Sequence, residues 1–416
     1  MRTPRVIVLA SSRSYRNALF LDAARRLGVE VVTGDDVPLP FLSRSAAELP
    51  LDYRDLRRSV EAIAAYAGEH PVGAVLGVDD SGVMLAARAA QALGLPGNAP
   101  EAATAARDKL VMRRCFQEAG IPQPRFRLVK ATDDPRAFAH EIAYPSVIKP
   151  TLLSASKGVM RVDGPQELFA RLLRLRRILA GERCQDVLIE DFVPGIQVAL
   201  EGLLDAGRLH VLALFDKPDP LDGPFFEETI YVTPSRLTDE VQQALRAAAA
   251  AAAAALGLRE GPVHAELRWN SAGPSLIEVA GRSIGGLCSK TLRFGLEDST
   301  SLEELILRQA LGRDFSRLLR EPGASGVLMI PIPRGGILRA VAGEPEARAV
   351  PLVSSVEITA RLHYPVVPLP EGDSYLGFVF ARGESPAAVE AALRAAHAEL
   401  RFEIVTEIAL AGGEKG

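Results

Sequence analysis

Two glutamates and an arginine in the second half of the chain have types and spacing that suit phosphate chemistry. Glu266 and Glu278 each end a run typical of a β-strand, and Arg282 follows four residues later. Alternating apolar residues and a turn at 270–274 predict a hairpin that places the two carboxylates side by side. Paired carboxylates suit a Mg²⁺ ion that bridges nucleotide phosphates, and the guanidinium could hold a phosphoryl or carboxylate group. The alternative is an ordinary hairpin with solvated side chains.

A second phosphate-binding pattern lies earlier in the chain. Lys149 ends the predicted strand 146–149 and is followed by Pro150, and the loop 152–158 carries hydroxyls, a cation and a glycine. Such a loop could fold over the β and γ phosphates, although a polar surface turn is the alternative interpretation. Lys109 begins the preceding helix and, taken alone, would be a solvated lysine. The loop residues concerned are Ser154, Ser156, Lys157 and Gly158.

Composition limits the classes of function. The chain has 416 residues, 48% of them apolar, which is enough for a large core divided among about three domains. There are 48 basic and 52 acidic residues, so the net charge of -4 favours neither a nucleic acid nor an anionic membrane as partner.

The cysteines and apolar runs predict a cytoplasmic protein. Cys115, Cys184 and Cys288 are odd in number and widely spaced, which argues against a disulfide framework or a structural zinc site. The apolar run 6–10 is too short for a signal peptide, and no run approaches the ~18 apolar residues needed to span a bilayer.

The first ~100 residues alternate between strand and helix patterns, which predicts a doubly wound α/β domain. Ser11, Ser12 and Arg13 stand where a dinucleotide-binding loop would have glycines, so we expect no nucleotide there. The predicted strands are 6–10, 29–33 and 74–78, and the predicted helices are 18–27, 56–67 and 83–93.

The middle of the chain predicts two further units. A helix at 108–119 is followed by strands at 126–129, 146–149 and 187–190, with helices at 135–142 and 165–179. A hairpin of 197–204 with 209–215 comes next. Nine successive alanines, 247–255, lie in a predicted helix 239–256, where alanine favours close helix packing.

The chain changes character after Gly312. Strand patterns at 327–332, 356–362 and 376–381 and a helix pattern at 386–400 predict a separate α+β cap domain. None of its residues suggests chemistry.

Six segments, taken in order, resemble the ATP-grasp superfamily, and within it the carboxylate–amine ligases of the L-amino acid ligase type. The segments are RDKLVMRRCFQEAGIPQP, YPSVIKP, SASKGV, VLIEDFVPGIQVALEG, HAEL and LIEVAGRSIGG. Biotin carboxylase is a more distant likeness. The resemblance is closest from Gly94 to Gly286, and the ordered set is far more specific than any one segment.

The resemblance implies a fold of the α/β and α+β classes, with three parts. These would be a Rossmann-like (pre-ATP-grasp) domain at 1–105, an ATP-grasp domain at 106–312 whose small lobe spans about 124–193, and a C-terminal α+β domain at 313–416. Relatives with this build are commonly homodimers.

The resemblance also assigns ATP and metal contacts. Lys109 and Lys149 would bind the α and β phosphates, Glu266 and Glu278 would bind Mg²⁺ or Mn²⁺, and His264 would touch nucleotide or substrate unless it is a core histidine. Adenine would be read mainly by the backbone of Glu190, Asp191, Phe192 and Val193, with the Glu190 carboxylate accepting from the exocyclic amine.

For the reacting groups, the resemblance implies that Arg282, Gly285 and Gly286 stabilise an acyl phosphate and the tetrahedral intermediate after it. Glu228, or alternatively Glu227, would bind the amino group of an amino acid. Glu201 would face nucleotide or substrate, and Lys217 would touch phosphate or be an exposed lysine. The substrate contacts would also include Ser283, Gly286 and Leu287.

Two features depart from the family pattern. Many members have a metal-binding Asn two residues after the second glutamate, whereas this chain has Ala280, so water or phosphate must complete the coordination. The phosphate loop also has fewer glycines than that of biotin carboxylase, and no biotin-carrier motif is present.

The implied activity is a ligase that phosphorylates a carboxylate with ATP and lets an amine displace the phosphate, forming an amide or dipeptide. Its substrates would be small carboxylates and amines, with amino acids expected. The alternatives are a carboxylase acting on bicarbonate, a ligase for a carboxylate that is not an amino acid, and a non-catalytic ATP-binding sensor or scaffold.

Overall fold

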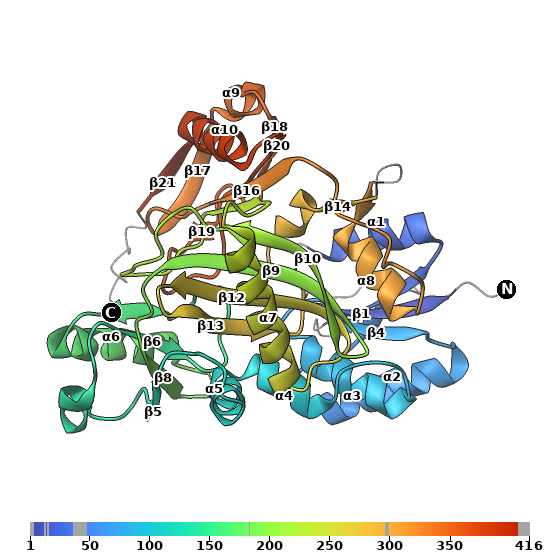
Figure 1. Cartoon of the computed structure of the whole chain (residues 1–416), viewed down its shortest axis with the longest axis horizontal. Coiled ribbons are helices and arrows are strands. Elements are labelled where there is room, and N and C mark those ends of the chain that lie inside the picture. The colour runs from blue at the N-terminus through green and yellow to red at the C-terminus, as the bar shows by residue number, and fades with distance from the viewer. Residues whose placement is uncertain are drawn as a thin grey trace, which may run out of the picture.

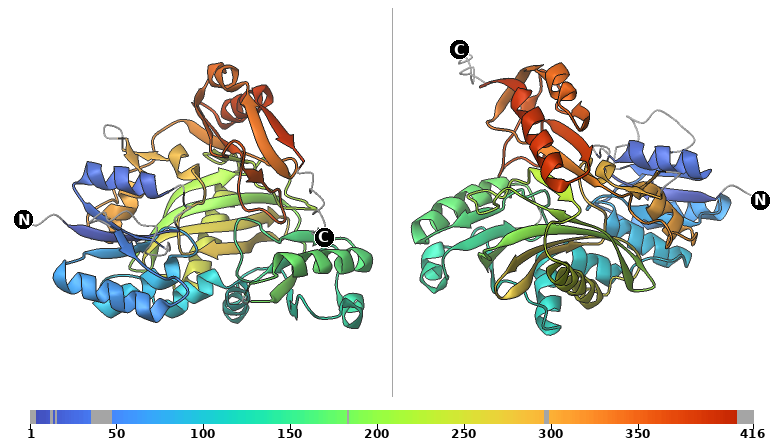
Figure 2. Two further views of the ribbon diagram at one scale, coloured as in Figure 1. Left: turned by 180° about the vertical axis from the view of Figure 1, so that it is seen from behind. Right: turned by 45° about the horizontal axis from the view of Figure 1, so that its top comes forward.

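The computed structural model describes residues 4–11, 14, 16–35, 48–182, 184–295 and 299–406, arranged around one central sheet (Figure 1). An N-terminal part, drawn in blue, lies at one end of this sheet, and a small green lobe lies at the other. The C-terminal part, orange to red, stands above it, and Figure 2 shows the same arrangement from two other sides. Ser12 and Arg13 lie outside the described residues.

The N-terminal part is a four-stranded parallel sheet, as the alternation of strands and helices predicts. Its strands, in spatial order, are β3 (Glu48–Pro50), β2 (Glu30–Asp35), β1 (Arg5–Leu9) and β4 (Ala74–Gly77). Its helices are α1 (Asn17–Leu27), α2 (Leu56–Glu69), α3 (Val83–Leu93) and α4 (Pro100–Arg107). Helix α4 was not among the predicted elements, although Pro100 at its first turn is a usual helix start.

The small lobe has an antiparallel sheet with its own apolar core. Its strands, in spatial order, are β5 (Phe126–Lys130), β8 (Asp186–Asp191), β6 (Ser146–Pro150) and β7 (Met160–Val162), and helix α6 (Pro165–Ile178) packs on them. The predicted helix at 135–142 is wrong. Two 3-10 turns, Pro135–Ala137 and Ala139–Glu141, replace it, because Phe138 leaves the helical region (φ -139°) and is buried in the core.

The central sheet has eight strands, helix α7 (Asp239–Ala255) crosses the face seen in Figure 1, and helix α5 (Lys109–Glu118) packs into the same apolar core. The strands, in spatial order, are β13 (Gly273–Ala280), β12 (Gly261–Asn270), β9 (Ile196–Asp205), β10 (Arg208–Asp216), β11 (Ile230–Thr233), β16 (Ala324–Ile330), β20 (Gly377–Gly383) and β18 (Val353–Ile358). Ala249, Ala252 and Ala253 of α7 are buried in the core beneath it, as the alanine run predicts.

The C-terminal part is not separate at the level of the sheet, which corrects the prediction of an independent cap. Strand β16 pairs with β11 in antiparallel register from Ile230 opposite Leu328 to Thr233 opposite Ser325, so three C-terminal strands extend the central sheet. The remaining C-terminal elements are β17 (Gly336–Ala342), α9 (Glu344–Ala349), β19 (Pro365–Val366), α10 (Pro386–Glu399) and β21 (Arg401–Val405).

One apolar core joins all three parts of the chain. Phe20 of α1, Phe215 of β10 and Phe378 of β20 belong to the same buried cluster, and each is at most 2% exposed. The segment between β13 and β16 contributes η4 (Cys288–Thr291), β14 (Arg293–Phe294), β15 (Thr300–Ser301) and α8 (Leu302–Ala310).

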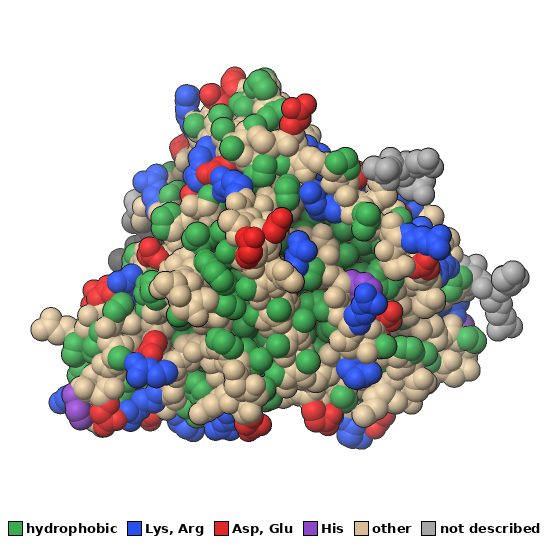
Figure 3. All heavy atoms as spheres, in the orientation of Figure 1, with side chains coloured by type: hydrophobic (Ala, Val, Ile, Leu, Met, Phe, Trp, Pro, Cys, Tyr) green, Lys and Arg blue, Asp and Glu red, His purple; other side chains and the backbone are tan. Residues whose placement is uncertain are grey.

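The surface agrees with the balanced composition. Basic and acidic side chains are interspersed on the face shown in Figure 3, without an extended patch of one sign. Among the described residues, none of the helices combines the length and apolar character that crossing a membrane requires.

Candidate active site

The hairpin of β12 and β13 places the two predicted metal ligands directly opposite each other. Glu266 pairs with Glu278 in the antiparallel register, and a bulge follows at once, since Leu267 then pairs with Leu276. Residues that face each other across two antiparallel strands point to the same side of the sheet. Both glutamates line a cavity of about 370 Å³.

This cavity lies where all parts of the molecule meet. The N-terminal part contributes Asp80, the small lobe contributes Lys149, and the C-terminal part contributes Met329 and Tyr375. The C-terminal part therefore reaches the site, although its sequence suggested no chemical role.

Lys109 reaches the cavity because a capped helix begins at it. The Asp108 side chain caps α5 by accepting from the amides of Leu110 and Val111. The Lys109 ammonium, 6% exposed, lies 3.2 Å from Glu278 and donates to the carbonyl of Leu153 at 2.8 Å. The interpretation of Lys109 as a solvated lysine is therefore wrong.

Lys149 belongs to a buried charged network at the end of β6. Its ammonium lies 2.7 Å from Glu190, which also accepts from Arg113 at 2.7 Å. Burial, assisted by nearby Arg113 and opposed by Glu190, lowers the pKa of Lys149 to about 8. The Glu190 carboxylate thus positions two cations. Its predicted hydrogen bond with the exocyclic amine of adenine would require its oxygens to be shared with Lys149 and Arg113.

The segment Glu190–Val193 connects the small lobe to the central sheet and lines the cavity. The amides of Asp191 and Phe192 donate to the carbonyls of Arg125 and Pro145, both at 3.0 Å. Among the residues the structure describes, none accepts a hydrogen bond from the Val193 amide. Arg268 donates to the Val193 carbonyl at 2.7 Å.

Only part of the predicted phosphate loop, 152–158, lines the cavity. Ser154 and Ser156 line it. Lys157 and Gly158 do not: the Lys157 ammonium lies 3.8 Å from Asp373, and the Gly158 amide donates to the carbonyl of Pro370 at 2.8 Å. Gly158 has a positive φ of 76°, and a Cβ there would come within 2.8 Å of the Pro150 ring, so its glycine serves local packing in this arrangement.

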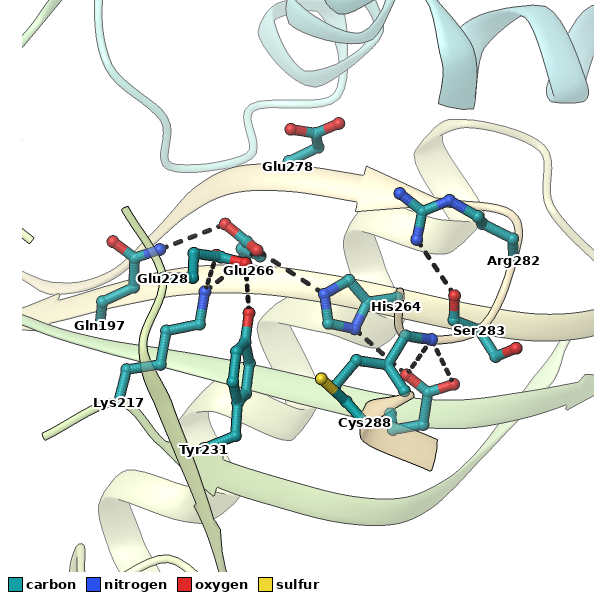
Figure 4. A network of polar contacts seen from close by, with 12 residues as sticks. Gln197, Lys217, Glu228, Tyr231, His264, Glu266, Glu278, Arg282, Ser283 and Cys288 are labelled. Atoms are coloured by element: carbon teal, nitrogen blue, oxygen red, sulfur yellow. Dashed lines mark hydrogen bonds and ion pairs between the residues drawn. The ribbon is translucent and has the colours of Figure 1, made fainter. Parts of the chain in front are cut away.

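A buried lysine, Lys217, contacts both Glu266, a predicted metal ligand, and Glu228, the predicted ligand of the amino group (Figure 4). The Lys217 ammonium donates to Glu228 and, at 3.0 Å, to Glu266. The Tyr231 hydroxyl donates to the second oxygen of Glu228 at 2.6 Å. Lys217 is 6% exposed, so the interpretation of it as an exposed lysine is wrong. Glu227, the alternative to Glu228, is not among the cavity-lining residues.

His264 links the metal site to the loop after β13 (Figure 4). Its Nδ1 lies 3.1 Å from Glu201, and its Nε2 lies 3.6 Å from Glu266. Burial disfavours the charged ring, but these two carboxylates outweigh it and raise the pKa of His264 to about 9. Glu201 is fully buried and accepts from the Ile284 amide at 3.0 Å, so it lies beneath the cavity and not facing it.

Arg282 lines the cavity and is paired with Asp80, a residue that the sequence did not predict to be part of the site. Its Nε and Nη2 donate to the two oxygens of Asp80, each at 2.9 Å, and its Nη1 donates to the Ser283 carbonyl at 3.0 Å. Asp80 follows β4. Doubly wound sheets bind ligands at the carboxyl ends of their parallel strands, so the position of Asp80 after a predicted strand was the signal that could have identified it.

Of the other residues predicted to contact substrate after β13, two line the cavity and two do not. Gly285 and Gly286 line the cavity, and Gly286 has a φ of 58° with a Cβ position 3.0 Å from the Phe378 ring, so only glycine fits well. Ser283 and Leu287 do not line it. Ser283 accepts from Arg16, and Leu287 is buried in the shared core.

The donor set fits a magnesium ion. Two opposed carboxylates supply the hard oxygen ligands that Mg²⁺ prefers, with water and substrate phosphate supplying the others. Within the described ranges, no cluster of three or more Asp, Glu, His or Cys side chains is arranged to hold a metal, so the protein alone offers an incomplete coordination sphere. Incomplete protein ligation is usual for Mg²⁺ at nucleotide sites.

The chain is similar to known proteins in each of its three parts. Three family models match successive parts of the chain: the ATP-grasp N-terminal domain at residues 21–97, the ATP-grasp domain at 142–291, and the L-amino acid ligase C-terminal domain 2 at 328–405.

Solved structures agree over nearly the whole chain. The L-amino acid ligase from Bacillus licheniformis is 26% identical, with a TM-score of 0.79 over 98% of this chain and all of that one. The biotin carboxylase from Campylobacter jejuni shares the fold, with a TM-score of 0.67, at 17% identity over 97% of this chain and 93% of that one.

Among curated proteins, the alanine–anticapsin ligase of Bacillus subtilis is 29% identical over 246 residues, or 54% of this chain. The match spans 52% of that ligase, about half its length. ATP-grasp enzymes use ATP, typically with Mg²⁺, and the L-amino acid ligase family acts on amino acids. The chain belongs to the ATP-grasp superfamily, as a carboxylate–amine ligase of the L-amino acid ligase type.

Proposed function

We propose that the chain joins two amino acids through an acyl phosphate made at the expense of ATP, and that the cavity described above holds both reactions. One amino acid supplies its carboxylate and the other supplies its amine. The products are a dipeptide, ADP and phosphate.

In this proposal Glu266 and Glu278 hold Mg²⁺, which supplies charge neutralisation to the nucleotide phosphates when it is bound. Lys109 and Lys149, which both line the cavity, contribute two further positive charges to the phosphates. Lys109 contacts Glu278 and the loop carbonyl of Leu153, so its direction is already set before nucleotide enters.

The carboxylate oxygen of the first amino acid attacks the γ-phosphorus, and the bond from that phosphorus to the bridging oxygen of ADP breaks. Glu228 holds the ammonium of this amino acid while sharing its oxygens with Lys217 and Tyr231. Arg282, Gly285 and Gly286 line the cavity, and in this proposal they stabilise negative charge on the acyl group.

The neutral amine of the second amino acid then attacks the acyl carbon, and phosphate leaves with the oxygen that came from the carboxylate. Water would hydrolyse the same intermediate, so it must be excluded. The small lobe and residues 153–156 of the loop line the cavity, and in this proposal they exclude water from it.

One observation carries the proposal: Glu266 and Glu278 face each other in a cavity that also contains Lys109, Lys149 and Arg282. These five charged side chains come from three separate stretches of the chain, namely α5, β6 and the β12–β13 hairpin with the loop after it. A structural role alone gives no reason to gather them around about 370 Å³ of space.

An ADP-release assay with Mg²⁺, ATP and pools of amino acids tests the proposal. We expect ADP release that depends on amino acids, with a dipeptide of matching mass in equal amount. ADP release that depends on bicarbonate alone would indicate a carboxylase. Normal ATP binding without turnover from any pool would favour a sensor and contradict the proposal.

A further inference from the structure

We propose that Asp80 is a positioning residue for the ligase reaction: it holds one edge of the Arg282 guanidinium so that the opposite edge faces the reacting groups. The inference rests on the proposed function, because it assigns to Arg282 a ligand in the same cavity.

The contact has the geometry of a fixed fork. Nε and Nη2 of Arg282 donate to Oδ1 and Oδ2 of Asp80, both at 2.9 Å, which is the side-on arrangement of two parallel hydrogen bonds. Nη1 donates to the carbonyl of Ser283 at 3.0 Å. A guanidinium has five N–H donors. One N–H on Nη1 and one on Nη2 therefore have no acceptor among the described residues.

Both partners lie at the cavity and are largely shielded from solvent. The side chains of Arg282 and Asp80 are 14% and 19% exposed, and both line the cavity. Burial disfavours the charged carboxylate, but Arg282 outweighs it and keeps the pKa of Asp80 well below its usual range. The pair stays charged, and its direction is set by hydrogen bonds.

The loop that carries Asp80 is itself held in place. The Asp79 carboxylate accepts from the amides of Ser11, Ser81 and Gly82, at 2.8, 3.1 and 3.2 Å. Asp80 thus projects from a loop whose backbone is tied to the end of β1 on one side and to the start of α3 on the other.

A buried arginine ties the backbones of both partners together. Arg16, 3% exposed, donates through Nη1 to the carbonyl of Val78 at 2.5 Å and to the carbonyl of Ser283 at 3.3 Å. Val78 lies two residues before Asp80, and Ser283 follows Arg282. The N-terminal part therefore fixes the arginine through its side chain and through the neighbouring backbone.

This arrangement gives the N-terminal part, whose sequence lacks a dinucleotide-binding fingerprint, a role at the cavity. Its contribution is to orient a cation that the central sheet supplies. A misplacement of a reacting or stabilising group by about 1 Å can lower turnover about 100-fold. Loss of the Asp80 fork leaves the arginine charged, with the Ser283 carbonyl as its remaining acceptor among the described residues, so the guanidinium can turn about that bond.

Asp80→Asn tests the proposal, because it keeps the size of the side chain and removes one acceptor oxygen. We expect kcat/KM for the amino acids to fall about 10- to 100-fold, with the Kd of ATP unchanged. Asp80→Glu should recover part of the loss. Glu30→Gln, which removes the ion pair to Arg5 in the same sheet at 2.8 Å and does not line the cavity, is the matched control and should behave as wild type.

A double-mutant cycle separates positioning from a general effect on the fold. If Asp80 acts through Arg282, Asp80→Asn should add little to the loss caused by Arg282→Gln. Losses that multiply, or an Asp80→Asn enzyme as fast as wild type or faster, would overturn the proposal. Should Asp80→Asn fail to fold, Asp80→Glu provides the readout, because it keeps the charge and displaces the carboxylate that forms the fork: kcat/KM should lie below wild type with the Kd of ATP unchanged, and wild-type kcat/KM would overturn the proposal.

The two proposals fail in different ways. A wild-type protein without amino-acid-dependent turnover would contradict the proposed function, and the positioning role would fall with it. A wild-type protein that turns over normally, with an Asp80→Asn variant that matches it, would contradict only the role of Asp80.

Discussion

At the scale of single residues, the cations of the site are each paired with a carboxylate of the protein. Lys109 contacts Glu278, Lys217 contacts Glu266, and Arg282 is paired within the protein. Buried charges are tolerated only when they are paired. Each cation that is proposed to bind phosphate or acyl groups therefore has to be shared between its protein partner and the ligand.

The first residue-scale prediction concerns the opposed glutamates. Glu278→Gln and Glu266→Gln should each lower kcat/KM about 100-fold or more, because an amide keeps the shape but loses the negative charge that holds Mg²⁺. Turnover measured across a Mg²⁺ titration checks this. Glu61→Gln, an exposed change on α2, is the control. Wild-type rates in either active-site variant, at every Mg²⁺ concentration, would rule out the assigned metal ligands.

The second residue-scale prediction is a pH dependence of nucleotide binding. Burial lowers the pKa of Lys149 to about 8, so its charge is present below that pH and is lost above it. The affinity for ADP, measured by calorimetry without metal from pH 7 to 9.5, should therefore fall as pH rises past about 8. Lys149→Arg keeps its charge throughout this range, so its affinity should fall less, and only toward pH 9, where His264 in the same cavity loses its charge. Parallel pH curves for the two proteins would contradict this role for Lys149.

At the scale of elements, local sequence patterns predicted most helices and strands of the site. They could not predict which strands pair when those strands are far apart in the sequence. Alternation and the turn at 270–274 predicted the hairpin and the pairing of Glu266 with Glu278. The bulge after Glu266 and the four-residue strand β11, which joins the C-terminal strands to the sheet, leave no periodic signal. The Asp80 contact joins residues 202 positions apart, so spacing could not reveal it.

The element-scale prediction tests why α7 is so rich in alanine. Ala252 is fully buried against the hairpin that carries the two glutamates, whereas Ala251 is exposed. Ala252→Leu should lower the free energy of unfolding by about 1–3 kcal/mol, because added methylenes overfill a close-packed interface. Ala251→Leu should change it by less than about 0.5 kcal/mol. Urea denaturation measures both, and equal effects would show that the alanine run does not serve packing.

At the scale of the whole molecule, the small lobe is held by the C-terminal part as well as by the central sheet. Arg174 of α6 donates to both oxygens of Glu371, at 2.6 and 2.8 Å, and its guanidinium lies 5.1 Å from the ring centre of Phe225. The same turn accepts from the Gly158 amide through Pro370. The small lobe, the loop expected to bind substrate and the C-terminal part are thus linked.

The whole-molecule prediction concerns the exclusion of water. Glu371→Gln removes a partly exposed ion pair worth about 0–1 kcal/mol, so the fold should persist while the small lobe opens more often. More acyl phosphate should then be hydrolysed, and the ADP released per dipeptide should rise above one. Glu344→Gln, which removes an exposed pair on α9, should leave this ratio unchanged. An unchanged ratio in Glu371→Gln would show that this contact does not control closure.

The central claim is that ATP activates a carboxylate as an acyl phosphate in this cavity. The most direct measurement uses an amino acid labelled with ¹⁸O in its carboxylate, followed by mass analysis of the released phosphate. The mechanism predicts one ¹⁸O atom in each phosphate, because the amine displaces the oxygen that attacked the γ-phosphorus. Unlabelled phosphate formed alongside dipeptide would contradict it.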